Sequence, residues 1–308
     1  MNSTTMAADL AVTECSVWLH FPRWTLLPES PVYTLRGLLG EALIAVLHPG
    51  LSRGADPPED SPFWPLFKPS KRDPKVQRPC FLLDCPQGAG GAVSLSARLR
   101  LFGTGQRYWG VLLEALRTAE RLGFGAGDRT PFEVETGAVV ASALPWATND
   151  AGKADGNVRF ALDFVTPAQL TVRLDDPVGK VGLADLLELE RARLRGVEYS
   201  PFALIPYAVA NSVVRGLASL AAAYGGGSLG AEGWHEAALR QTRVLRYSLW
   251  PEQDVHFSEN KRVDLGGVMG HVEMDGPQEL LHIMRCGELI GVGAHTGFGC
   301  GRIRGTLL

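Results

Sequence analysis

Two stretches of the chain repeat one order of predicted strands and helices, and this repetition constrains the fold more than any other feature. In the first stretch, apolar residues at helical spacing predict helices at 32–47 and 108–122. Alternating polar and apolar residues predict strands around them, at 14–24 (ended by Pro22), 80–84, 92–102 and 132–143. A basic segment at 67–78 and a glycine turn at 87–91 connect these elements. The order is βαββαβ, that of a ferredoxin-like domain.

The second stretch has the same order with one extra helix. Strands are expected at 157–164, 170–174, 244–255, 268–274 and 299–307, and helices at 183–195, 204–224 and 277–289. Small and polar residues at 147–156 separate the two stretches and form the best linker in the chain. We therefore expect an α+β protein of tandem ferredoxin-like domains, residues 1–146 and 157–308, with a glycine-rich loop at its C-terminal end.

Composition excludes several classes of protein. The 308 residues are 45% hydrophobic and 20% charged, and no apolar run approaches the roughly 20 residues that span a bilayer, so no membrane contact is expected. Five scattered cysteines argue against a disulfide framework and suit a reducing cytoplasm. Cys80 and Cys85 have no second pair and no nearby histidine, so no metal site is expected, and no cofactor is predicted.

The glycine-rich loop follows the last predicted helix. Its five glycines lie within eleven residues, at Gly291, Gly293, Gly297, Gly299 and Gly301. Successive backbone N–H groups in such a loop can line a concavity that accepts phosphate oxygens. A nucleotide-binding loop is disfavoured, because those loops follow a first strand and open a helix. The plain alternative is a flexible turn.

Basic side chains gather locally although the net charge is −3. Lys68, Lys71 and Arg72 form one basic loop. Arg243 and Arg246 precede a second group, Lys261 and Arg262, at the tip of the late hairpin. Local stripes of this kind, rather than the net charge, decide whether a polyanion can bind. A solvated surface is the alternative for both groups.

Four sequence segments carry a resemblance to a known family. They are Leu-Arg-Gly-Leu-Leu-Gly at 35–40, Leu-Phe-Lys-Pro at 66–69, Gly-Gly-Val-Met-Gly at 266–270, and the glycine-rich loop at 291–301. With them, nearly the full length resembles the CRISPR-associated repeat RNA (pre-crRNA) processing endoribonucleases of the RAMP superfamily, which serve antiviral defence. The loop alone does not separate cleaving members from non-cleaving relatives.

The resemblance implies binding of a CRISPR repeat transcript, expected as a stem-loop, and one metal-independent cut that gives mature guide RNA. The ribose 2′-OH attacks the adjacent phosphate and leaves a 2′,3′-cyclic phosphate and a 5′-OH, and the enzyme can stay bound to its product. Two alternatives stay open. One is a non-catalytic RAMP-type subunit that binds guide RNA among the other subunits of a CRISPR effector complex, and the other is an α+β protein that binds a small molecule.

The resemblance also suggests catalytic residues on the first helix. Relatives place a histidine on or just after this helix, often with a tyrosine or lysine nearby, and here His48 and Tyr33 match. The loop at 51–62 departs from the pattern because it has neither histidine nor lysine. Arg36 and Arg23 are then the substitutes, and each would clamp the phosphate electrostatically. The alternatives are a helix cap for His48 and surface salt bridges for the arginines.

The predicted RNA-binding residues combine both basic groups with the glycine-rich loop. A basic hairpin tip suits the phosphates of a duplex stem. Within the loop, His295 and Arg302 join the five glycines as RNA contacts, although His295 can also be read as an exposed loop residue. The full set is Lys68, Lys71, Arg72, Arg243, Arg246, Lys261, Arg262, Gly291, Gly293, His295, Gly297, Gly299, Gly301 and Arg302.

Overall fold

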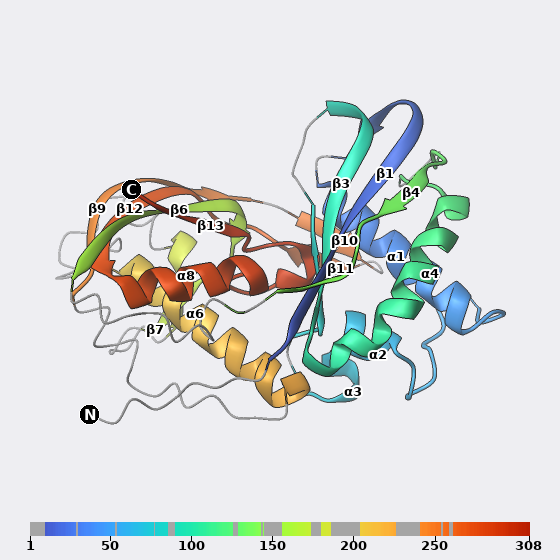
Figure 1. Cartoon of the computed structure of the whole chain (residues 1–308), viewed down its shortest axis with the longest axis horizontal. Coiled ribbons are helices and arrows are strands. Elements are labelled where there is room, and N and C mark those ends of the chain that lie inside the picture. The colour runs from blue at the N-terminus through green and yellow to red at the C-terminus, as the bar shows by residue number, and fades with distance from the viewer. Residues whose placement is uncertain are drawn as a thin grey trace.

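Two antiparallel sheets, each covered by helices on one face, build the computed structural model (Figure 1). The structure describes residues 10–28, 30–52, 54–76, 78–85, 90–125, 129–142, 144, 156–173, 180–185, 204–225, 241–253, 255–258 and 261–308. The predicted linker at 147–156 and helix at 183–195 lie almost wholly outside these residues, as does most of the turn at 87–91. Among the described helices, none is both long and apolar enough to cross a membrane.

The first sheet has the strand order β2-β3-β1-β4. β5 pairs with residues 12–14 of β1, and β4 pairs with residues 17–20 of the same strand. Its strands are β1 (Val12–Leu27), β2 (Phe81–Asp84), β3 (Gly90–Phe102), β4 (Glu133–Thr136) and β5 (Val140–Ser142). The helices α1 (Pro31–Leu47) and α4 (Trp109–Leu122) cover one face. Leu35, Leu39 and Leu43 form the buried stripe of α1. Each such side chain contributes roughly 1.5–3 kcal/mol to stability.

The second sheet repeats this arrangement in the order β13-β6-β12-β9. Its strands are β6 (Asn157–Ala168), β9 (Arg243–Glu252), β12 (Gly267–Pro277) and β13 (Ile303–Leu307), and its helices are α6 (Ile205–Leu220) and α8 (Gln278–Ile290). A π-helical turn, η3 (Ala221–Gly225), continues α6. In both sheets the fourth strand lies beside the first, followed by the third and the second. This is the ferredoxin-like order, so the predicted tandem fold is confirmed.

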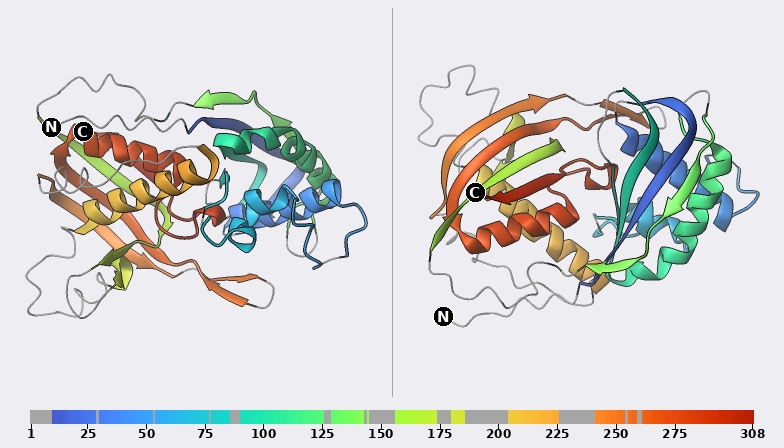
Figure 2. Two further views of the ribbon diagram at one scale, coloured as in Figure 1. Left: turned by 90° about the horizontal axis from the view of Figure 1, so that it is seen from below. Right: turned by 45° about the horizontal axis from the view of Figure 1, so that its top comes forward.

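Two short ribbons extend from the second sheet. One joins β7 (Thr171–Arg173) to β8 (Lys180–Gly182), and the other joins β10 (Val255–Ser258) to β11 (Lys261–Asp264). The β10–β11 ribbon continues the β9–β12 hairpin and projects beyond the sheet (Figure 2). The predicted hairpin of the second half is therefore present, with its basic residues on the ribbon.

Several predicted boundaries are wrong. The first strand runs past Pro22 to Leu27, because the pairing of β1 with β3 shifts register between His20 and Thr25, where proline needs no ladder bond. The single strand expected at 132–143 is two strands, separated where the Gly137 N–H bonds the Ser16 carbonyl. The basic segment at 67–78, expected only as a connection, carries the helix α3 (Pro69–Arg72), and the helix α2 (Phe63–Phe67) directly precedes it. The last strand begins at Ile303 rather than 299. The domain boundaries stay a prediction.

Two arginines of the first half, the buried Arg100 and the partly buried Arg78, hold the C-terminal end of α8. Arg100 Nη1 donates to the carbonyl oxygens of Glu288 and Leu289 at 3.4 and 3.5 Å. Arg78 Nη1 donates to those of Ile290 and Gly291 at 3.0 and 3.3 Å, and its Nη2 reaches the Gly293 carbonyl at 3.3 Å. The last carbonyls of a helix lack partners within it and carry partial negative charge, so guanidinium groups suit them. This clamp fixes the glycine-rich loop against the first half.

Candidate functional site

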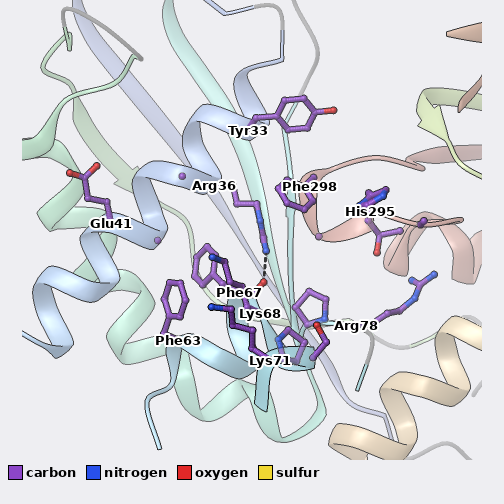
Figure 3. Close-up of a pocket in the computed structure, with 18 of the residues that line it drawn as sticks. Tyr33, Arg36, Glu41, Phe63, Phe67, Lys68, Lys71, Arg78, His295 and Phe298 are labelled. Atoms are coloured by element: carbon purple, nitrogen blue, oxygen red, sulfur yellow. Dashed lines mark hydrogen bonds between the residues drawn. The ribbon is translucent and has the colours of Figure 1, made fainter. Parts of the chain in front are cut away.

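A cleft of about 750 Å³ lies between α1 of the first half and the glycine-rich loop of the second (Figure 3). The segments at 67–71 and 78–79 complete its walls. Four cationic side chains line it, from Arg36, Lys68, Lys71 and Arg78. Glu41 is the acid among the described lining residues, and Arg129 Nη2 neutralises it at 2.7 Å. The cleft is therefore positively charged and suits an anionic ligand.

Arg36 is the buried cation of this cleft, with only 7% of its surface exposed. Its Nη2 donates to the Phe67 carbonyl oxygen at 2.9 Å, and its guanidinium carbon lies 4.8 and 5.2 Å from the ring centroids of Phe67 and Phe298. Its Nη1 is buried and has no hydrogen-bond partner among the described residues. Burial lowers the pKa of Arg36 to about 10, so it stays charged at neutral pH. A buried cationic donor without an acceptor is costly and favours an anionic ligand.

The glycines of the loop let it pack closely. Gly291, Gly293, Gly299 and Gly301 have positive φ. A Cβ on Gly299 would lie 2.6 Å from Val32 of α1, and one on Gly301 would clash with the Val292 carbonyl oxygen. Most N–H groups of the loop already have partners, as the Gly301 N–H has in the Pro167 carbonyl at 2.8 Å. Close packing is thus their evident role, and a phosphate cradle stays a prediction.

His295 stands at the edge of the cleft in an unusual backbone conformation. Its φ of 58° is the only positive value at a non-glycine position in the described residues. Its ring is half-buried and packs edge-on against Phe298, with centroids 6.1 Å apart. Burial lowers the pKa of His295, and the nearby Asp264 partly opposes this. The imidazole is therefore largely neutral at pH 7.

Phe298 joins the candidate groups of the two halves. Its ring lies 6.4 Å from the Tyr33 ring, beside the Arg36 guanidinium and next to His295 (Figure 3). The Tyr33 hydroxyl and Cys300 Sγ lie 3.5 Å apart. Two titratable groups and one buried cation thus surround a single aromatic ring.

Other predicted residues lie outside the cleft. His48 caps the C-terminal end of α1, and its Nε2 shares a 2.8 Å hydrogen bond with Ser61 Oγ. Arg23 is exposed on β1. Arg302 Nε forms a 3.0 Å ion pair with Asp84. None of the three is in the cleft lining, and their roles stay predictions.

The predicted stem-binding residues lie on the second sheet and its ribbon. Arg243 and Arg246 are exposed on β9, an edge strand. Lys261 and Arg262 lie on β11, where Lys261 pairs with Ser258 at the end of the ribbon. Arg72 ends α3, next to the cleft residue Lys71. The structure thus separates the basic residues into a cleft group and a ribbon group.

Two residues of the site were not predicted from the sequence. Arg78 lies in the predicted basic segment, and only its contacts with the α8 end distinguish it from its neighbours. Phe298 is the one aromatic residue within the glycine-rich loop. An aromatic ring among glycines was a signal that could have marked it.

Comparisons with known proteins agree with this architecture. A family model described as CRISPR-associated endoribonuclease Cas6 matches residues 162–303. A product complex of Thermus thermophilus Cas6 is 15% identical, with 96% of this chain and 99% of that chain covered and a TM-score of 0.56. A partial Cas6-RT-Cas1–Cas2 complex is 12% identical, with 99% of this chain and 47% of that chain covered and a TM-score of 0.57. No curated protein matches the chain. The family match confirms the resemblance to CRISPR-associated endoribonucleases over residues 162–303.

Proposed function

We propose that this chain, which resembles the Cas6 endoribonucleases, binds CRISPR repeat transcripts and cuts them to give mature guide RNA. The observation that carries the proposal is the cationic cleft between the two halves, in which the buried Nη1 of Arg36 has no hydrogen-bond partner among the described residues. A phosphodiester supplies the anionic oxygens that such a group needs. The family match at residues 162–303, to a CRISPR-associated endoribonuclease, supports RNA as the source of that phosphodiester.

The cut needs no group beyond those of RNA and protein. The 2′-oxygen attacks the adjacent phosphorus, the bond to the 5′-oxygen breaks, and the products carry a 2′,3′-cyclic phosphate and a 5′-OH. Charge grows on the phosphoryl oxygens during this step, and the Arg36 guanidinium is suited to stabilise it. Loss of one such donor typically costs about 10²–10³ in rate. Tyr33, across Phe298, offers a phenol that can hold the same phosphate.

RNA is held on both sides of the proposed scissile phosphate. Lys68 and Lys71 line the cleft, and Lys71 Nζ meets Asp56 at 3.0 Å in an exposed pair. An exposed ion pair is worth little, so a phosphate can take the place of the carboxylate. On the other side, Lys261 and Arg262 on the ribbon suit the phosphates of a stem. Arg243 and Arg246 add two exposed cationic side chains on β9.

One observation favours a non-catalytic guide-RNA-binding subunit as the second candidate. His48, the histidine that the resemblance suggests for catalysis, is bonded to Ser61 and does not line the cleft. A chain that kept the cationic cleft but lacked a proton-transfer group would bind RNA without cutting it.

A cleavage assay with labelled repeat RNA separates the two candidates. In EDTA, the proposed enzyme should produce one cut with a cyclic phosphate and a 5′-OH. A 2′-deoxy substitution at the scissile nucleotide should abolish the cut and leave affinity unchanged, because only the nucleophile is removed. Tight binding without cleavage would support the non-catalytic subunit. Failure to bind the repeat more tightly than a scrambled RNA would refute both candidates.

A further inference from the structure

We propose that His295, in the glycine-rich loop, is a catalytic residue that takes the proton from the attacking 2′-OH. The inference rests on the proposed endoribonuclease function and names the group that the first helix does not supply to the cleft. His295 is the histidine among the described lining residues. Two other described histidines, His20 and His271, form ion pairs outside the cleft, with Glu135 and Asp163 respectively.

The position of His295 relative to Arg36 suits this reaction. The two side chains come from different halves of the chain and both contact the Phe298 ring. A phosphodiester bound by Arg36 therefore lies next to the Phe298 ring. His295 lies next to the same ring, on the side of the glycine-rich loop (Figure 3). The attacking 2′-oxygen sits on the ribose carbon next to the one that carries the 3′-oxygen of that phosphodiester. General-base catalysis requires this adjacency before any question of pKa.

The backbone at His295 holds the side chain in place at a cost. Its φ of 58° is left-handed, and four neighbouring positions with positive φ are glycines. A non-glycine residue in this region costs of order 1–3 kcal/mol, and such residues cluster at functional sites. A glycine at this position would avoid the backbone cost but would have no imidazole. The ring packs edge-on against Phe298 of η4 (Thr296–Phe298), which begins directly after His295.

The charges around His295 keep the imidazole ready to accept a proton. Burial lowers its pKa, and the Asp264 carboxylate opposes that effect. The cleft wall that it faces carries cationic side chains, a neutralised acid and a phenol, namely Arg36, Lys68, Lys71, Arg78, Glu41 and Tyr33. A cationic wall disfavours a further positive charge, so it acts in the same direction as burial. A neutral imidazole at pH 7 can act as a base.

The step balances without any further reactant. The 2′-O–H bond breaks and its proton goes to an imidazole nitrogen while the 2′-oxygen bonds to phosphorus. The bond between phosphorus and the 5′-oxygen breaks, and the leaving oxygen takes a proton from water. Deprotonation of the imidazolium by solvent restores the starting state.

Two substitutions remove the base and preserve the loop. His295→Gly favours the left-handed conformation, and His295→Asn tolerates it and cannot titrate near neutral pH. Each should slow single-turnover cleavage by about 10²–10⁴, the range for losing a general base, and change the Kd for repeat RNA by less than about threefold. Added imidazole should partly restore cleavage by His295→Gly but not by His295→Asn, whose side chain fills the space. His20→Asn is the matched control and should cleave like the wild type.

The pH profile tests the proton transfer itself. The wild-type rate should rise with pH through an inflection below the ordinary histidine value of about 6.5 and then level off. His295→Asn should lose this inflection. Cleavage by His295→Gly within about threefold of wild type would overturn the proposal, as would an unchanged inflection in His295→Asn. A wild-type chain that fails to cut any repeat RNA would instead refute the proposed function.

Discussion

Replacing Gly301 by alanine should destabilise the protein more than replacing any other positive-φ glycine of the glycine-rich loop by alanine. Gly301 has a φ of 70°, and an added Cβ would clash with the Val292 carbonyl oxygen. That carbonyl belongs to backbone rather than to a flexible side chain, so relief requires movement of the main chain. Two hydrogen bonds depend on this position, from the Val292 N–H to the Gly301 carbonyl and from the Gly301 N–H to the Pro167 carbonyl, both 2.8 Å.

The magnitude follows from four contributions. The left-handed conformation costs an L-residue roughly 1–2 kcal/mol, and the reduced entropy of the unfolded chain returns about 0.4–1 kcal/mol. Forcing extra atoms into a packed site typically costs about 1–3 kcal/mol. Weakening two backbone hydrogen bonds adds about 1 kcal/mol each. We expect a net loss of about 3–6.5 kcal/mol, which lowers Tm by roughly 5–10 °C in a chain of this size.

Two further glycines serve as matched controls. Gly54 also has a positive φ, of 85°, but no atom of the described residues lies within 4 Å of its added Cβ, so Gly54→Ala should cost only about 1 kcal/mol. Gly37 lies in the interior of α1, and among the described residues no atom lies within 4 Å of its added Cβ. Gly37→Ala should therefore stabilise the protein by about 0.5–1 kcal/mol. Urea titration and calorimetry of the three variants measure this order. If Gly301→Ala were no less stable than Gly54→Ala, close packing of the loop would be refuted.

Three other predictions concern catalysis, binding and thiol chemistry. Arg36→Met should slow cleavage about a hundredfold or more, and His48→Ala less than tenfold, because only Arg36 lines the cleft; the reverse order in single-turnover rates would move the site to the end of α1. Lys261→Ala should weaken RNA binding and reduce the slope of log K against log salt by about 1, with cleavage of bound RNA unchanged; an unaltered slope in a filter-binding titration would remove the ribbon from the interface. All five cysteines are buried and free, and burial raises the pKa of Cys80 to about 12. A thiol-specific reagent at pH 8 should therefore react only after denaturation. Rapid reaction of the native protein would contradict this packing.

The sequence was sufficient to predict the tandem fold because its evidence is local. The stripe of Leu35, Leu39 and Leu43 repeats at helical spacing whatever lies against it, and the strand alternation survives in both halves. The predicted boundaries of strands are wrong where pairing with a strand far away in the sequence decides where a strand ends. Pro22 is tolerated in β1 because the ladder with β3 slips there, and no neighbour of Pro22 in the sequence encodes that slip.

The candidate site was predicted only in part, for a related reason. The glycine-rich loop and Arg36 were both named, but their contact is tertiary, since Phe298 of the loop packs against the buried guanidinium of Arg36 on α1. His48 matched a pattern along the chain, yet it ends α1 and turns to Ser61. His295 is conspicuous only once its φ is known. Arg78 resembled its basic neighbours until the carbonyls that it binds were placed.

The arginine clamp on α8 makes the two halves a natural split pair. A fragment ending at Leu144 would keep Arg78 and Arg100 with no carbonyls to bind, and a fragment starting at Gly156 would carry the α8 end without them. Neither fragment would contain the whole cleft, because Arg36 and His295 come from opposite sides of the break. Mixing the two fragments should therefore restore RNA cleavage by complementation, and fusing each to one of two interacting proteins would turn this chain into a reporter of their association.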